Sequence, residues 1–141
     1  MKVIIHTSKS KFGNAALIDY WHRNPPNNYN RIGYNLVILN GYLDNSTDFI
    51  KFYDGLIETG RRFGTTGAHC KGHNKSIGIC LIGEPGNYSM RQLKSLDQSL
   101  LILREMYTDI EVFQHSDFDD EKPYCAGLDE GYMERLQELV E

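Results

Sequence analysis

A nearly continuous apolar segment at residues 76–83 constrains the fold of this chain more than any other feature. The segment reads Ser-Ile-Gly-Ile-Cys-Leu-Ile-Gly and offers no alternation of apolar and polar side chains. Such a run is typical of a strand that is covered on both faces, at the centre of a sheet. We therefore expect a sheet with other elements packed on each side of it.

The rest of the chain supplies those elements. Asn14 is a plausible N-cap for the first helix, and Ser89 with Gln92 three residues later forms a capping-box pattern for the second. Apolar runs and helical periodicity predict strands at 2–6, 36–39, 56–58 and 110–114, and helices at 14–22, 89–107 and 129–140. Alternating strands and helices indicate an α/β fold, a single domain with a central mixed sheet flanked by helices.

Several local features add detail to this prediction. Asn40-Gly41 is a strong two-residue hairpin signal after the strand at 36–39. Residues 44–54 fit either a hairpin extension or one helical turn, and both readings stay open. Residues 60–75 form a polar loop punctuated by glycine, and long loops of this kind are usually functional. On the second helix, the residues expected to face the core are Leu93, Leu96, Leu100, Leu101 and Leu103.

Composition excludes several classes of protein. A hydrophobic content of 40% indicates a globular chain, and a net charge of −4 gives no basic surface for nucleic acid. Three cysteines are an odd number at no disulfide-like spacing, which argues against a disulfide-stapled secreted domain. The N-terminus has neither a signal-peptide nor a transmembrane pattern. We expect a monomer that is made in the cytoplasm, does not insert into membranes, and needs another factor to reach any external substrate.

His6, His115 and Cys125 are the candidate metal ligands. Each histidine ends an apolar run, Val3–Ile5 and 110–113 respectively, so two neighbouring strands would bring them together. Two imidazoles, a thiolate and a water describe an open catalytic zinc site. Spacing alone leaves the alternatives open, because a histidine at a strand end is more often structural and His115 also fits a solvated turn.

Four ordered motifs strengthen this hypothesis. The segments are 31–36 (Arg-Ile-Gly-Tyr-Asn-Leu), 58–61 (Glu-Thr-Gly-Arg), 67–69 (Gly-Ala-His) and 74–83 (Asn-Lys-Ser-Ile-Gly-Ile-Cys-Leu-Ile-Gly). Together they resemble the core of the zinc-dependent N-acetylmuramoyl-L-alanine amidases, which include the peptidoglycan recognition proteins and the amidase-type phage lysozymes. The resemblance covers nearly the whole chain, and it implies that residues 1–141 form one amidase catalytic domain.

The resemblance also implies roles for the residues around a zinc ion. His6, His115 and Cys125 occupy the family's ligand positions in order. Tyr34 matches the family's active-site tyrosine, whose hydroxyl would hydrogen-bond the attacking water or the tetrahedral intermediate. Lys122 is the candidate cation for the developing oxyanion. It lies one residue out of register, because the family's usual position, two residues before the third ligand, holds Pro123.

Further matches concern the substrate groove. His69 corresponds to a groove-lining histidine of the family, while Arg61, Arg62 and Asn74 would bind the stem peptide or serve as loop-stabilising residues. Some relatives carry a glutamate general base on the central strand. Here that position is Cys80, which indicates the tyrosine-dependent branch and is most simply a small buried hydrophobe.

The sequence therefore predicts a Zn²⁺-dependent peptidoglycan amidase. It would cut the amide between N-acetylmuramic acid and L-alanine of the stem peptide, acting on the cell wall as a phage or prophage endolysin. The alternative is a non-catalytic peptidoglycan-binding module of the same fold. Cys125 discriminates between the two, because non-lytic recognition proteins commonly lack this cysteine.

Overall fold

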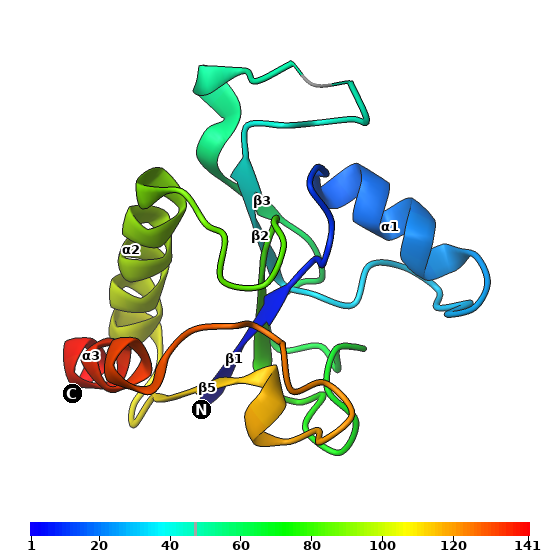
Figure 1. Cartoon of the computed structure of the whole chain (residues 1–141). Coiled ribbons are helices and arrows are strands. Elements are labelled where there is room, and N and C mark those ends of the chain that lie inside the picture. Colours follow the sequence, from blue (N-terminus) through cyan, green and yellow to red (C-terminus); the bar gives the residue numbers. More distant parts are fainter. Residues whose placement is uncertain (47) are drawn as a thin grey trace.

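A computed structural model describes residues 1–46 and 48–141 of the chain (Figure 1). Its strands are β1 (Lys2–Thr7), β2 (Leu36–Asn40), β3 (Asp54–Thr59), β4 (Ile77–Leu81) and β5 (Glu111–Gln114). Its helices are α1 (Ala15–Arg23), α2 (Met90–Met106) and α3 (Glu130–Val140), with short 3-10 helices η1 (Lys51–Tyr53) and η2 (His115–Asp117). Each strand and helix predicted from the sequence is present, with ends that differ by a few residues.

The five strands form one mixed sheet in the order β3-β2-β4-β1-β5. Only β3 is antiparallel to its neighbour, whereas β2, β4, β1 and β5 are parallel. The apolar segment at 76–83 supplies β4, the middle strand, and each of its five residues is buried. The predicted α/β fold with a central mixed sheet is confirmed.

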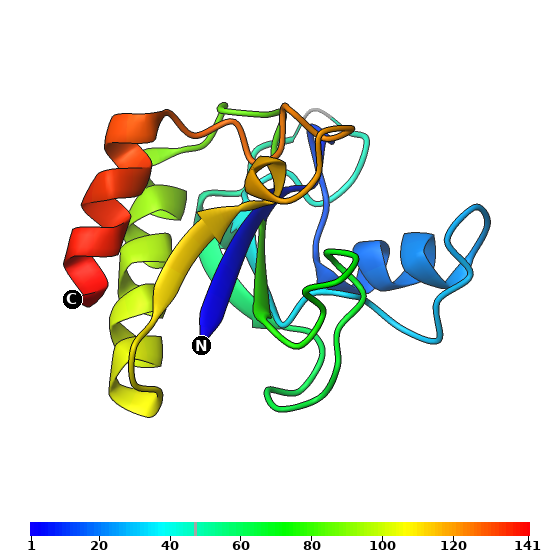
Figure 2. The ribbon, with the colours of Figure 1, turned by 90° about the horizontal axis from the view of Figure 1, so that it is seen from below.

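Helices cover both faces of the sheet. α2 and α3 lie side by side on one face, and α1 lies on the other (Figures 1 and 2). Because side chains alternate along a strand, Val3 and Ile5 of β1 join the core beneath α2 and α3. His6 points the other way, toward the α1 face, where it pairs in register with Cys80 of β4. The alternation in β1 therefore decides which face carries the candidate site.

Capping groups fix the ends of the helices. The Asn14 side chain accepts a hydrogen bond from the Leu17 amide, and α2 begins with the predicted capping box of Ser89 and Gln92. Gln92 is fully buried, and its side-chain amide also donates to the carbonyl groups of Ile38 and Ile82. This helix cap therefore also ties α2 to the middle of β2 and to the residue that follows β4.

Two local predictions were wrong. Asn40-Gly41 does not form a two-residue hairpin, because β2 returns as β3 only at Asp54, after a connection that includes η1. For residues 44–54, the sequence fitted either a hairpin extension or one helical turn. Residues 51–53 form a helical turn, and residue 47 lies outside the described residues. Leu101 of α2 was expected to face the core, but it is 40% exposed. The buried side of the helix carries small residues such as Ser95 and Ser99 instead.

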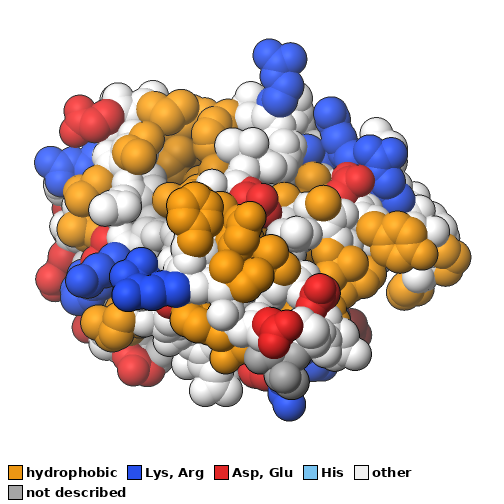
Figure 3. Space-filling view, turned by 90° about the horizontal axis from the view of Figure 1, so that it is seen from above, with side chains coloured by type: hydrophobic (Ala, Val, Ile, Leu, Met, Phe, Trp, Pro, Cys, Tyr) orange, Lys and Arg blue, Asp and Glu red, His pale blue; other side chains and the backbone are white. Residues whose placement is uncertain are grey.

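Hydrophobic side chains are also exposed at one end of the molecule. Figure 3 shows hydrophobic side chains gathered on the face seen from above. The exposed large hydrophobic residues of the protein include Phe49 and Ile50 just before η1, Phe52 within it, and Met90 at the start of α2. Over the described residues, no helix is both long and apolar enough to cross a bilayer.

Candidate metal centre

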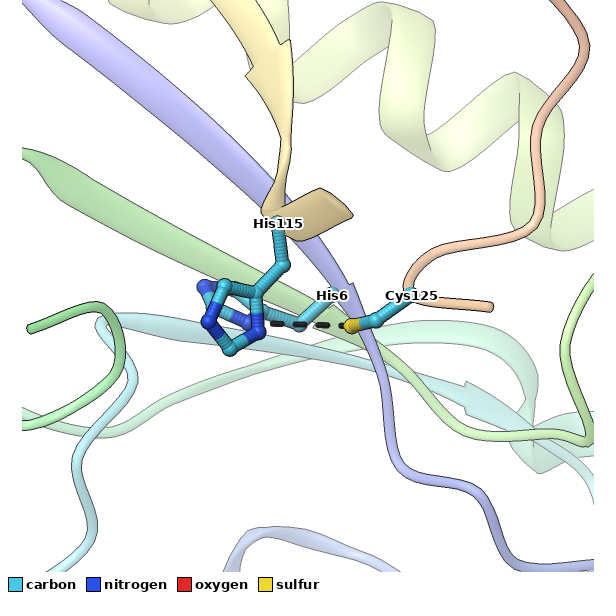
Figure 4. A group of neighbouring side chains, drawn as sticks. All are labelled: His6, His115 and Cys125. Carbon is cyan, nitrogen blue, oxygen red and sulfur yellow. Dashed lines mark hydrogen bonds between the residues drawn. The ribbon is translucent and has the colours of Figure 1, made fainter. Parts of the chain in front are cut away.

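Three potential metal ligands converge on the α1 face of the sheet. His6 lies next to the last residue of β1, His115 follows β5 directly, and Cys125 lies in the loop before α3. One ligand atom from each residue lies within 4.8 Å of the other two. Figure 4 shows the two imidazoles and the thiol facing a common point, with His6 Nδ1 and Cys125 Sγ 3.9 Å apart.

The strands explain how distant residues meet. β1 and β5 are parallel neighbours with Ile5 opposite Gln114, so the next residues, His6 and His115, follow at the same level. Backbone groups then hold Cys125 against both. The Thr7 amide donates to Cys125 Sγ at 3.3 Å, and the Ser116 amide donates to the Cys125 carbonyl at 2.6 Å. The residue after each histidine therefore helps to anchor the cysteine.

Gln114 provides a second anchor for the cysteine loop. Its side-chain oxygen accepts hydrogen bonds from the amides of Ala126 and Leu128 at 3.2 and 3.1 Å. Its side-chain nitrogen donates to the Leu128 carbonyl at 2.8 Å. The glutamine before one ligand thus fixes the backbone after another. Sequence reasoning missed Gln114, since a lone glutamine at the end of a strand carries no signal.

The protonation states of the histidines suit metal binding. Burial lowers the pKa of His6 well below its ordinary value, and the neighbouring histidines add to this effect. Burial also lowers the pKa of His115, although Asp119 opposes the shift. Both imidazoles are therefore neutral near pH 7 and have a lone pair to offer. Burial raises the pKa of the Cys125 thiol to about 11, so a metal ion would have to displace its proton.

The donor set fits zinc. Tetrahedral Zn²⁺ with ordinary bond lengths would separate a nitrogen ligand from a sulfur ligand by about 3.6 Å. The 3.9 Å between His6 Nδ1 and Cys125 Sγ is close to that value. Two imidazoles and one thiolate also leave one tetrahedral position for water or substrate, as catalytic zinc sites do. The site therefore suits a catalytic metal better than a closed structural one.

A cleft of about 460 Å³ opens beside these ligands. His115 forms part of its wall, so a molecule in the cleft can approach the candidate metal position. Other residues that line it are His22, Tyr34, His69, Asn74, Asp119 and Lys122. The structure thus brings four more of the sequence-predicted residues, Tyr34, His69, Asn74 and Lys122, to the same cleft.

Tyr34 packs directly against the ligands. Its ring centroid lies 4.9 Å from that of His6, and the side chain is half-buried. Burial raises the pKa of its hydroxyl well above the ordinary value, and the thiols of Cys80 and Cys125 add to the shift. Tyr34 therefore keeps its proton at neutral pH and can donate a hydrogen bond. Cys80 itself is fully buried, as predicted for a small hydrophobe.

Lys122 also lines the cleft and is exposed. Its positive charge acts on the site. It opposes the rise that burial causes in the pKa of Cys125, and it adds to the lowering that burial causes in the pKa of His115. The one-residue shift relative to the family's usual position has therefore not removed the cation from the cleft. A catalytic role for Lys122 stays a prediction.

The predicted groove residues have different surroundings. His69 is buried, and its Nδ1 lies 2.9 Å from His6 Nε2. Asn74 uses its side-chain oxygen to accept the backbone amides of His69 and Cys70, both at 2.8 Å. Burial lowers the pKa of His69 to about 4, so its imidazole is neutral. Both residues are engaged within the protein, and substrate contact by either stays a prediction.

Arg61 and Arg62 are not brought to the site. The Arg61 guanidinium donates to the carbonyl groups of Ile32 at 2.8 Å and Thr66 at 2.6 Å, which crosslinks two loops. Arg62 is exposed, and neither arginine lines the cleft formed by the described residues. Of the two readings of Arg61, the geometry favours loop stabilisation over substrate binding.

Two further cleft residues were missed by sequence reasoning. His22 of α1 accepts the Gly33 amide at its Nδ1, at 2.8 Å, and packs against Tyr34 with ring centroids 5.3 Å apart. Asp119 places a carboxylate oxygen 3.6 Å from His115 Nε2. His22 lies within a helical pattern and Asp119 within an acidic loop, so neither differs in sequence from a surface residue.

These features define a class: an α/β domain with a candidate His-His-Cys metal site at the ends of two neighbouring parallel strands, β1 and β5. N-acetylmuramoyl-L-alanine amidase LysC from Clostridium intestinale has a similar structure, with a TM-score of 0.76 and 21% identity, covering 97% of this chain and 82% of LysC. A mutant of Drosophila PGRP-LB has a TM-score of 0.67 and 25% identity, covering 86% of this chain and 74% of that protein.

A human recognition protein, PGRP-IβC in complex with a glycosamyl muramyl pentapeptide, is also similar, with a TM-score of 0.64 and 18% identity. That match covers 84% of this chain and 72% of the human protein. The chain therefore shares its fold with N-acetylmuramoyl-L-alanine amidases and peptidoglycan recognition proteins. The resemblance stated from the sequence motifs is confirmed at this level.

Sequence comparisons add less. No model of a known protein family matches the chain. An uncharacterized protein of Haemophilus influenzae is 39% identical over 72 residues. That match takes in 45% of this chain and 62% of the relative, less than two thirds of its length.

Proposed function

We propose that this chain is a zinc-dependent amidase that hydrolyses the bond between N-acetylmuramic acid and L-alanine of the peptidoglycan stem peptide. The convergence of His6, His115 and Cys125 beside an open cleft is the observation that carries the proposal. A fold shared with amidases makes this chemistry the natural use of such a site. Peptidoglycan or its muropeptides would be the partner.

The residues around the site have distinct tasks in this proposal. His6, His115 and Cys125 would hold Zn²⁺, which supplies a Lewis acid that polarises the amide carbonyl and activates water near neutral pH. Tyr34, protonated at neutral pH, donates a hydrogen bond to the oxygen on which negative charge develops. Lys122, which lines the same cleft, adds positive charge there.

Cys125 favours an enzyme over a recognition module. A peptide-binding module has no need for a buried thiol that accepts a backbone amide beside two neutral imidazoles. One structural neighbour, LysCS from Clostridium intestinale, is itself named an endolysin and has a TM-score of 0.76. This similarity supports the proposal that the chain acts as an endolysin. A phage or prophage lytic enzyme is therefore the role that we propose.

Digestion of a defined muropeptide tests the function directly. The zinc-loaded protein is expected to release a lactyl-bearing glycan and a peptide with a free L-alanine amino terminus, which mass spectrometry identifies as separate products. Protein stripped by a chelator is the control, and adding back zinc should restore cleavage. Cleavage at a glycosidic or peptide–peptide bond would contradict the proposal, as would tight binding of the muropeptide without cleavage by the zinc-loaded protein.

Replacing Lys122 tests the electrostatic part of the proposal. Lys122→Ala is expected to lower kcat about tenfold, a modest effect because the exposed ammonium is screened by solvent. Lys122→Arg should retain more activity, while Lys75→Ala, outside the cleft, is the matched control. An unchanged kcat on one muropeptide would show that Lys122 is a solvated loop residue without a catalytic role.

A further inference from the structure

His69 links the candidate ligand His6 to a backbone carbonyl. His69 Nε2 lies 3.2 Å from the Ser76 carbonyl oxygen, and His69 Nδ1 lies 2.9 Å from His6 Nε2. A carbonyl oxygen only accepts hydrogen bonds, so the ring proton of His69 must lie on Nε2. The Ser76 carbonyl thereby fixes the tautomer of His69.

The tautomer of His69 in turn determines that of His6. A neutral imidazole with its proton on Nε2 has a bare Nδ1, which can only accept. His6 must therefore donate from its Nε2, and this leaves the lone pair of His6 Nδ1 free. That atom is the one that faces Cys125 Sγ, at 3.9 Å. The hydrogen bonds thus run in one direction, from His6 to His69 to Ser76.

We propose that His69 is a positioning residue that fixes His6 as the Nε2–H tautomer, with Nδ1 directed to the metal. The inference rests on the metal site of the proposed function and adds a residue outside the ligand trio. Histidines that bind metal commonly donate their other ring N–H to such a partner, which sets the tautomer and the ring orientation. Here the partner is a second imidazole, held by the Ser76 carbonyl.

Two glycines leave room for the His69 ring. A Cβ atom at Gly78, in the middle of β4, would lie 2.8 Å from His69 Cγ, and one at Gly67 would lie 2.7 Å from His69 Cδ2. Neither glycine has a positive φ, so the backbone conformation does not require glycine at these positions. Glycine is required there because a side chain would occupy the space of the His69 imidazole. Asn74 holds the segment from outside by accepting the His69 amide.

The same contacts argue against substrate binding as the main task of His69. Both of its ring nitrogens already have partners within the protein, and the residue is only 8% exposed. A substrate that used either nitrogen would have to break a buried hydrogen bond. The geometry points to His6, and not to a ligand in the cleft, as the group that His69 serves.

Nitrogen NMR of the metal-free protein tests the inference without any substitution. Long-range ¹H–¹⁵N correlations of the imidazoles are expected to show His6 and His69 both as neutral Nε2–H tautomers. Observation of His6 as the Nδ1–H tautomer in the wild-type chain would overturn the proposal. This measurement needs neither metal nor substrate. The tautomer inference can therefore hold even if the chain cleaves no muropeptide, and the two proposals can fail independently of each other.

Zinc affinity, measured by competition with a chelator, supplies the second readout. His69→Leu is expected to weaken zinc binding about 10–100-fold and to give a mixture of His6 tautomers. His69→Asn, which places an acceptor oxygen near the position of Nδ1, should lose about tenfold or less. Gly78→Ala should reproduce the leucine variant, because the added methyl group displaces the His69 ring without changing any ionisable side chain.

Matched controls separate this effect from general damage to the loop or the fold. His73→Asn changes a histidine of the same loop that stacks on Phe118, and Gly131→Ala adds a methyl group in α3 where space is available. Both should keep wild-type zinc affinity and His6 tautomer. Wild-type zinc affinity in folded His69→Leu and Gly78→Ala proteins would show that His69 does not position His6.

Discussion

Cys125→Ala is expected to abolish both zinc retention and amidase turnover. The substitution removes one of three protein ligands, leaving His6 and His115 with two open positions to fill. A zinc site with four protein ligands contributes about 10–16 kcal/mol, so one ligand accounts for about 2.5–4 kcal/mol, or about 10²–10³-fold in affinity. Metal analysis of the freshly purified protein should fall from about one zinc per wild-type chain to a small fraction.

Two variants make this result specific. Cys125→Asp keeps an anionic ligand that zinc accepts, so it should hold zinc more tightly than Cys125→Ala and retain part of the turnover. Cys80→Ala removes another fully buried thiol from the same face of the sheet, outside the ligand trio, and should keep its zinc. Full zinc occupancy in folded Cys125→Ala would remove the cysteine from the site, and with it the argument for an enzyme over a recognition module.

The layers of the fold could be predicted because they depend on local patterns. The apolar segment at 76–83 has no polar face, so it required cover on both sides and became β4. The capping box at Ser89 set the start of α2, since it satisfies backbone amides close in sequence. The path between β2 and β3 could not be predicted in this way. Asn40-Gly41 permits a tight turn, but η1 and the contact of Gly41 with Ile50 extend the connection instead.

The meeting of His6 and His115 was predictable for a different reason, whereas Cys125 was assigned beside them through the resemblance to the amidases. Parallel neighbouring strands carry residues to the same level, so histidines at the ends of β1 and β5 meet if those strands are adjacent. The residues that orient His6 and Cys125 make contacts that form only in the folded chain, and no sequence pattern indicates these contacts. Gln114 meets Leu128 across a loop, and His69 reaches His6 only because Gly78, on another strand, leaves a space. The sequence therefore indicates the candidate ligands more readily than the groups that orient them.

Tyr34→Phe is expected to leave zinc in place and to remove most of the turnover. The substitution deletes only the hydroxyl group, while the ring keeps its packing against His6, at a centroid distance of 4.9 Å. Loss of one hydrogen-bond donor to a developing oxyanion costs about 10²–10³-fold in kcat. Because that donor acts mainly in the transition state, KM should change little while kcat falls.

Tyr53→Phe is the matched control for this prediction. Tyr53 packs against the same hydrophobic cluster on the α1 face as Tyr34, but it does not line the cleft formed by the described residues. Its variant should keep both zinc and turnover, so a loss confined to Tyr34→Phe would identify the hydroxyl beside the metal as the cause. If Tyr34→Phe instead turns over at the wild-type rate, Tyr34 serves only to pack the His6 ring, and charge on the oxyanion must be met by Lys122 and the metal alone.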